Sequence, residues 1–111
     1  MDVRISILAI GLLASCSSNS SGTVEESKET TTPISMEDAR TLYILHCSSC
    51  HGQDGKLGLS NAADLSKSKL SDLQIENTIR HGNDKGMMPY EAILSVGEIK
   101  GLIPFVKTLR K

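Results

Sequence analysis

Large aromatic side chains are almost absent from this sequence, since its 111 residues include no Trp, one Phe and two Tyr. Aromatic residues usually supply much of the apolar area that a small core buries. The part of the chain with helical patterns is shorter than about 80 residues, a length at which side chains alone rarely give a stable core. We therefore expect something other than side chains to complete the core.

An excess of either charge sign is also missing, as is any sustained alternation of apolar and polar residues. The formal net charge is -1 and the pI is near 6.3, and residues 34–111 carry ten basic and nine acidic side chains. This balance excludes the basic footprint of a nucleic-acid-binding protein. Because no strand pattern appears, we expect one all-α domain.

Cysteine is scarce, but two of the three cysteines stand in the segment Cys47-Ser48-Ser49-Cys50-His51. In a helical turn both thiols and the imidazole project from one face. Two thiols can add across the two vinyl groups of a haem, and the following imidazole then becomes the proximal iron ligand. A random order of these residues would give this pattern in roughly two chains in a thousand. The motif predicts one covalent haem c bound through Cys47 and Cys50, with His51 on the iron.

Two other uses of the motif stay open from the residues alone. Together with His46 or His81, the motif has the donor count of a zinc site. A thiol redox pair is the second alternative, but that chemistry belongs to a βαβ context that this chain lacks.

The surroundings of the motif resemble a known family. The segment from Tyr43 to Gly52, the later Met88-Pro89 and an amphipathic C-terminal helix are similar to those of small monohaem class I cytochromes c of bacteria. The resemblance covers residues 34–111. It implies a class I cytochrome c fold, with about three main helices and long loops wrapped around one covalent haem.

The resemblance also implies roles for individual residues. An aromatic residue four positions before the first cysteine packs on the C-terminal helix in this family, and Tyr43 stands there, with Phe105 as our candidate partner. A backbone carbonyl in the following loop commonly accepts the N–H of the proximal imidazole. Family members often carry proline where this chain has Ala63, so the acceptor for His51 stays open.

A sixth iron ligand is expected from the segment between His81 and Tyr90. This segment holds three donors that suit iron, namely His81, Met87 and Met88. Pro89 biases the residue before it toward extended backbone, and the resembled family places its ligand in a Met-Pro context. We therefore expect Met88 to bind the iron and Met87 to point away and serve as packing.

Three helices are expected from serine capping patterns, each with an acidic or amide side chain three residues after the serine. Their expected bounds are 35–47, 71–80 and 95–111. In the second of these helices we expect Leu73, Ile75 and Ile79 to form the buried face.

The N-terminal part of the chain has the features of a targeting segment. An apolar run at residues 3–14 fits a signal peptide, and Leu13-Ala14-Ser15-Cys16 resembles the lipobox of bacterial lipoproteins. An ordinary signal peptide with an incidental Cys16 is the alternative. The expected divisions are a signal peptide at 1–15, a flexible Ser/Thr-rich tether from lipidated Cys16 at 16–34 and the haem domain at 35–111.

The resemblance implies a non-enzymatic, monomeric single-electron carrier with His/Met axial ligation. We expect transient docking of redox partner proteins at the haem edge, shuttling between membrane-associated complexes, and a lipid anchor on the periplasmic side of the bacterial envelope. The alternative is a five-coordinate haem c protein with a peroxidase-like or gas-binding role, for which His81 is a nearby acid-base candidate.

Overall fold

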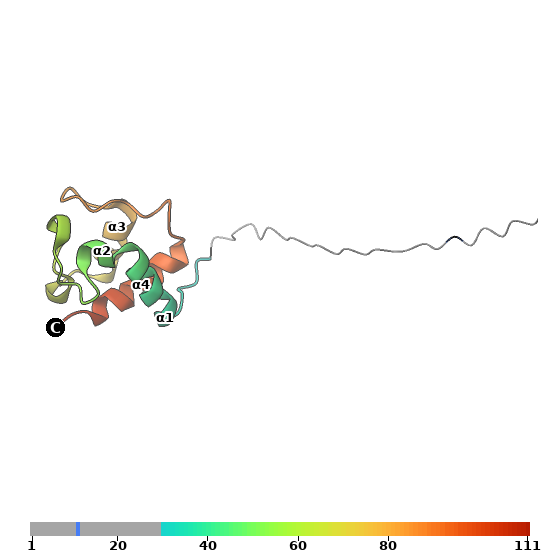
Figure 1. Cartoon of the computed structure of the whole chain (residues 1–111), viewed down its shortest axis with the longest axis horizontal. Helices are drawn as coiled ribbons and strands as arrows, with labels where there is room; N and C mark the ends of the chain where they lie inside the picture. The colour runs from blue at the N-terminus through green and yellow to red at the C-terminus, as the bar shows by residue number, and fades with distance from the viewer. Residues whose placement is uncertain (1–10, 12–29) are drawn as a thin grey trace, which may run out of the picture.

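The computed structural model describes residue 11 and residues 30–111, which include a helical domain at the C-terminal end (Figure 1). The helical elements are α1 (Met36–His46), α2 (Ser48–His51), the 3₁₀ turns η1 (Leu59–Asn61) and η2 (Leu65–Lys67), α3 (Asp72–His81) and α4 (Val96–Thr108). The described residues contain no strand, so the expected all-α fold is confirmed. The predicted signal peptide apart from Gly11, the predicted lipidation site Cys16 and most of the predicted tether lie outside the described residues.

Each long helix begins at its predicted serine cap. In α1 the hydroxyl of Ser35 accepts a hydrogen bond from the backbone N–H of Asp38 at 3.1 Å. The same hydroxyl donates a hydrogen bond to the Asp38 carboxylate at 2.6 Å. In α3 and α4 the capping box is complete, in the pairs Ser71–Gln74 and Ser95–Glu98. Side-chain oxygens thus satisfy N–H groups that the first helical turn leaves unpaired.

Among residues 30–111, no helix is long and apolar enough to cross a membrane.

The core lies where α4 packs against both α1 and α3. Its largest fully buried side chains are Tyr43, Ile99 and Leu102. The ring centroid of Tyr43 lies 5.1 Å from that of Phe105, with the rings tilted by 48°, which confirms the predicted contact. Pro104 stands inside α4 without ending it.

The predicted buried face of α3 is wrong at one position. Ile75 and Ile79 are buried, but Leu73 is 66% exposed. Leu73 precedes Ile75 by two residues, which corresponds to about 200° around the helix axis. The two side chains therefore point to nearly opposite sides of α3. The packing of α3 against α4 selects the isoleucine face.

The segment before α1 is docked on α4 through two glycines. The N–H of Gly97 donates to the carbonyl of Thr30 at 2.7 Å, and the N–H of Ile34 donates to the carbonyl of Gly97 at 3.2 Å. A Cβ at Gly97 would collide with the carbonyl oxygens of Thr30 and Thr32, and one at Gly101 would collide with the Ile34 side chain. The absence of side chains at Gly97 and Gly101 therefore allows this close approach.

Gly97→Ala is expected to destabilise the domain by about 1–3 kcal/mol, because the added methyl group meets backbone oxygens rather than a movable side-chain end. The loss should appear as a lower denaturation midpoint of the haem-containing protein. Lys100→Ala, an exposed change in the same helix, is the control and should shift stability by no more than about 0.5 kcal/mol. A midpoint for Gly97→Ala at or above that of the wild type would contradict the packing argument.

Candidate functional site

The Cys-x-x-Cys-His motif forms a single helical turn after α1. The N–H of Cys47 donates to the carbonyl of Tyr43 at 2.8 Å, and the N–H groups of Cys50 and His51 donate to the carbonyl of Cys47 at 3.2 and 3.0 Å. The turn ends at Gly52, which has a φ of 77°. The predicted helical spacing is therefore present, and the two thiols and the imidazole share one side of the turn.

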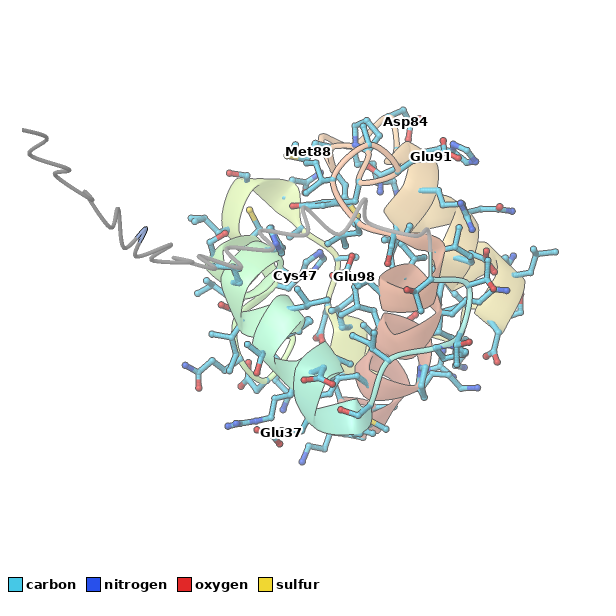
Figure 2. All side chains as sticks on the ribbon, turned by 90° about the vertical axis from the view of Figure 1, so that its right-hand side faces the viewer. Glu37, Cys47, Asp84, Met88, Glu91 and Glu98 are labelled. Atoms are coloured by element: carbon cyan, nitrogen blue, oxygen red, sulfur yellow. The ribbon has the colours of Figure 1, made fainter. Side chains whose placement is uncertain are left out.

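This turn forms part of the lining of a cavity of 810 Å³, a size typical of cofactor sites. Cys47, Cys50, His51 and Met88 all line it. Figure 2 shows Cys47 on the turn after α1 and Met88 on the separate loop that leads from α3 to α4. Apolar lining residues come from all three long helices and from both 3₁₀ turns; they include Tyr43, Leu59, Leu65, Ile75, Ile79, Leu102 and Val106.

The orientation of His51 is set by a backbone carbonyl. His51 Nδ1 lies 3.0 Å from the carbonyl oxygen of Ala63. A carbonyl oxygen only accepts, so Nδ1 carries the proton and Nε2 is left with its lone pair for a metal. The acceptor that the sequence left open is thus Ala63 itself, and the proline of related chains is not required for this contact.

The other two histidines differ in their relation to the cavity. His46 lines it, and its ring lies edge-on to Tyr90 with centroids 6.0 Å apart. His81 is not among the lining residues; its Nδ1 lies 3.6 Å from a carboxylate oxygen of Glu91. No group of three or more His, Cys, Asp or Glu side chains in the described part of the chain could hold a metal ion, so the zinc alternative has no support there.

The two neighbouring methionines occupy different surroundings. Met87 is partly buried and packs against the core, whereas Met88 is 52% exposed. Both residues line the cavity. The contact of Met87 with the core fits its predicted packing role, but its place in the cavity lining does not match the expectation that it points away. Met88 is the more exposed of the two methionines, and its assignment as the ligand stays a prediction.

Both tyrosine hydroxyls donate to backbone carbonyls that flank the motif, one on each side. Tyr43 donates to the carbonyl of Gly52 at 2.6 Å, and Tyr90 donates to the carbonyl of His46 at 2.9 Å. The role of Tyr90 was missed from sequence; its position two residues after Met88 is the only sequence signal that could have suggested it. The two tyrosines therefore hold the residues immediately before and after the motif.

Burial raises the pKa of Tyr43 from 10.0 to about 12, with smaller contributions from Cys47 and Asp54. Because the folded-state pKa exceeds the unfolded value, this group's contribution to stability is complete below pH 10.0 and is lost as the pH rises toward 12. The part of this pKa increase that comes from a Cys47 thiolate disappears when the Cys47 sulfur becomes a thioether. At neutral pH the Tyr43 hydroxyl keeps its proton and donates.

Burial is the larger cause that raises the pKa of the Cys47 thiol to about 11, and the charge of the neighbouring Cys50 is the smaller one. The free thiol is therefore protonated at neutral pH, which slows its oxidation. Cys47 and Cys50, the two cysteines of the described residues, form no disulfide, so both sulfurs are available for thioether bonds. Cys47 and Cys50 would hold the haem through thioether bonds, and each thiol would supply the proton that its addition requires, so no oxidant would be consumed.

Tyr43→Phe and Tyr90→Phe should each lower the free energy of unfolding by about 0.5–1.5 kcal/mol, because each removes a hydrogen bond to a backbone carbonyl that flanks the motif turn. The effect should be larger for Tyr43, which is only 1% exposed. Denaturant unfolding of the ferric haem-containing proteins measures it. Unfolding free energies equal to that of the wild type would show that these hydroxyls do not stabilise the turn.

The donor set and the cavity fit a haem and define the class of protein. The thiols of Cys47 and Cys50 are free for thioether bonds, His51 presents Nε2, and the apolar lining matches a flat macrocycle. A helical domain built around such a cavity is a monohaem class I c-type cytochrome.

Comparison with known proteins identifies the family. Residues 35–106 match the family described as cytochrome c oxidase, cbb3-type, subunit III, and the chain belongs to this family of cytochrome c domains. It accordingly carries haem c, bound covalently through Cys47 and Cys50. A search of curated proteins gave no match.

Solved structures agree with this assignment. The c-type cytochrome KustC0563 shares 33% identity, with a TM-score of 0.59 over 66% of this chain and 98% of that one. A point mutant of KustC0563 matches at 32% identity and a TM-score of 0.57, over 66% of this chain and 99% of the other. Cytochrome cL from Hyphomicrobium denitrificans, at 22% identity, supports the fold alone, with a TM-score of 0.58 over 68% of this chain and 48% of that one.

Proposed function

We propose that this protein is a single-electron carrier, not an enzyme, in which His51 and Met88 are the two axial ligands of the haem iron. The bound haem supplies an iron that alternates between the ferric and ferrous states. The chain's own contribution is to hold two donors of fixed type, an imidazole and a thioether. With both axial positions filled by side chains, no position is left for a substrate.

The observation that carries this proposal is the lining of the cavity by His51 and Met88 from separate segments. His51 is oriented by Ala63, and Met88 stands on a loop that is distant in sequence. A ligand pair held in place by the folded, haem-containing domain changes its geometry little on electron transfer. A thioether ligand also raises the reduction potential.

The five-coordinate alternative loses its main support. It needs an acid-base group beside an open coordination position. His81, the candidate for that group, is not among the cavity-lining residues and faces Glu91. We therefore do not favour a peroxidase-like or gas-binding role.

The test is a set of absorption spectra of the purified protein. A reduced-minus-oxidised spectrum should show a low-spin c-type haem, and the ferric form should show the weak far-red band of an iron-thioether bond. Neither carbon monoxide on the ferrous form nor cyanide on the ferric form should change the spectra readily. Fast and complete binding of carbon monoxide would favour the five-coordinate alternative.

We propose that the protein acts as a monomer and exchanges electrons by transient docking at the exposed cavity rim. Apolar side chains at this rim include Leu59, Leu70 and Met88, each more than one-third exposed. Such contacts suit small, short-lived interfaces with membrane-associated redox complexes.

We also propose a lipid anchor on Cys16 that holds the domain at the periplasmic side of the bacterial envelope. Cys16→Ala should then release the domain from membranes with its absorption spectrum unchanged, because the anchor and the haem domain are separate parts of the chain. The measurement is the distribution of haem between membrane and soluble fractions after a high-salt wash. A variant that stays with the membrane would contradict the anchor.

A further inference from the structure

One side chain binds the backbone of the loop just before Met88. The side-chain oxygen of Asn83, Oδ1, accepts the N–H of Lys85 at 3.0 Å and the N–H of Met87 at 3.2 Å. The backbone N–H of Asn83 donates to the carbonyl of Met87 at 3.1 Å. Asn83 therefore holds both backbone polar groups of the residue that precedes Met88.

A second set of hydrogen bonds holds the chain just after Pro89. The N–H of Tyr90 donates to the carbonyl of Ile79 at 2.9 Å, and the N–H of Glu91 donates to the carbonyl of Arg80 at 3.2 Å. The Met88-Pro89 pair thus lies between two backbone attachments. Pro89 has no N–H of its own, so the position of this pair depends on its neighbours.

Close approach of the loop to the end of α3 makes the first attachment possible. Gly82 has a φ of 66°, and a Cβ there would collide with the carbonyl of Met87. The Met87 carbonyl is therefore pressed against the helix end, within reach of Asn83. Asn83 itself also lines the cavity.

We propose that Asn83 is a positioning residue that keeps the Met88 thioether directed at the haem iron. This inference rests on the proposed ligation by His51 and Met88. Met88 is 52% exposed as a residue, so packing restrains it weakly and the backbone attachment of Met87 carries more of the restraint. Without Asn83, the loop would spend more time with Met88 away from the cavity, and external ligands would reach the iron.

A conservative replacement for Asn83 can be chosen from the same chain. Asp54 and Asp64 each use a carboxylate oxygen to accept the N–H two residues on, at 3.0 Å in both cases. This is the same local geometry as that between Asn83 and Lys85. Asn83→Asp should therefore keep the loop, whereas Asn83→Ala removes the acceptor.

The experiment compares Asn83→Ala and Asn83→Asp with the wild type, all as haem-containing proteins. Asn83→Ala should weaken the ferric far-red band and bind cyanide about tenfold more tightly, since the lost hydrogen bonds no longer oppose displacement of Met88. Asn83→Asp should stay near the wild type in both measurements. Asn77→Ala, an exposed Asn-to-Ala change on α3, is the matched control and should change neither.

Amide hydrogen exchange of the wild-type protein tests the role of Asn83 even if Asn83→Ala does not fold. The amides of Lys85 and Met87 should exchange their hydrogens about tenfold more slowly than those of Asp84 and Gly86. Equal exchange rates for these four amides would overturn the positioning role.

The outcomes also separate this inference from the ligation on which it rests. If Met88→Leu abolishes the far-red band while Asn83→Ala leaves the band and the cyanide affinity unchanged, the role of Asn83 is refuted and the ligation stands. A wild-type protein without a far-red band would overturn the ligation, and the role of Asn83 toward Met88 with it.

Discussion

A Cys47→Ala, Cys50→Ala double variant is expected to contain almost no bound haem after acid-acetone extraction, and its apoprotein is expected to be largely unfolded. The thioether bonds retain the cofactor, and the cofactor fills the centre of the domain. Core side chains from two different helices, including Ile75, Ile79 and Leu102, line the 810 Å³ cavity and lose packing partners without it.

The size of this effect follows from the cavity. At ~24 cal/mol per Å³, leaving even a quarter of the 810 Å³ unfilled would cost about 5 kcal/mol, which is comparable to the whole stability of a small domain. Each single cysteine variant keeps one possible thioether and should retain more haem than the double variant.

Haem content per polypeptide and far-UV circular dichroism together measure the prediction. Ser49→Ala, in the same turn, is the control and should keep its haem through extraction, because the hydroxyl at that position forms no thioether. Extraction-resistant haem in the double variant at the wild-type level would refute attachment through these two cysteines.

The second large effect is expected from Met88→Leu. In the ferric protein this change should abolish the far-red band, admit cyanide and lower the reduction potential. The potential should fall by a measurable part of the ~0.8 V range over which axial ligands set haem potentials. The physical reason is the loss of a thioether, which stabilises ferrous over ferric iron.

Met87→Leu is the matched control for Met88→Leu, since both substitutions exchange the same side chains at neighbouring positions. Met87 packs against the core, so its replacement by a residue of similar volume should cost less than about 1.5 kcal/mol of stability. The far-red band, the resistance to cyanide and the potential should be retained. The opposite pattern for the two variants would assign the ligand role to Met87.

Features that depend on a few neighbouring residues were predictable from sequence. The serine caps of α1, α3 and α4 bind backbone N–H groups three residues away. The motif turn likewise depends on the hydrogen bonds of one helical turn. The family resemblance added the contact between Tyr43 and Phe105, which no local pattern contains and which the structure confirms.

Features that depend on distant segments were decided by the tertiary structure. The hydrogen bond of Tyr90 to His46 joins residues 44 positions apart, and that of His51 to Ala63 spans 12 positions. The exposure of Leu73 depends on which face of α3 meets α4.

By itself, then, the sequence determined the helix starts, the spacing of the haem-attachment residues and the composition that calls for a cofactor in the core. Only the tertiary structure decided which carbonyl orients His51 and which histidine is excluded from the cavity lining. Helix caps and turns bring together groups that are already neighbours along the chain, so local chemistry is sufficient. The other contacts appear only when α1, α3 and α4 pack, because the bonded groups belong to segments whose separation is set by that packing.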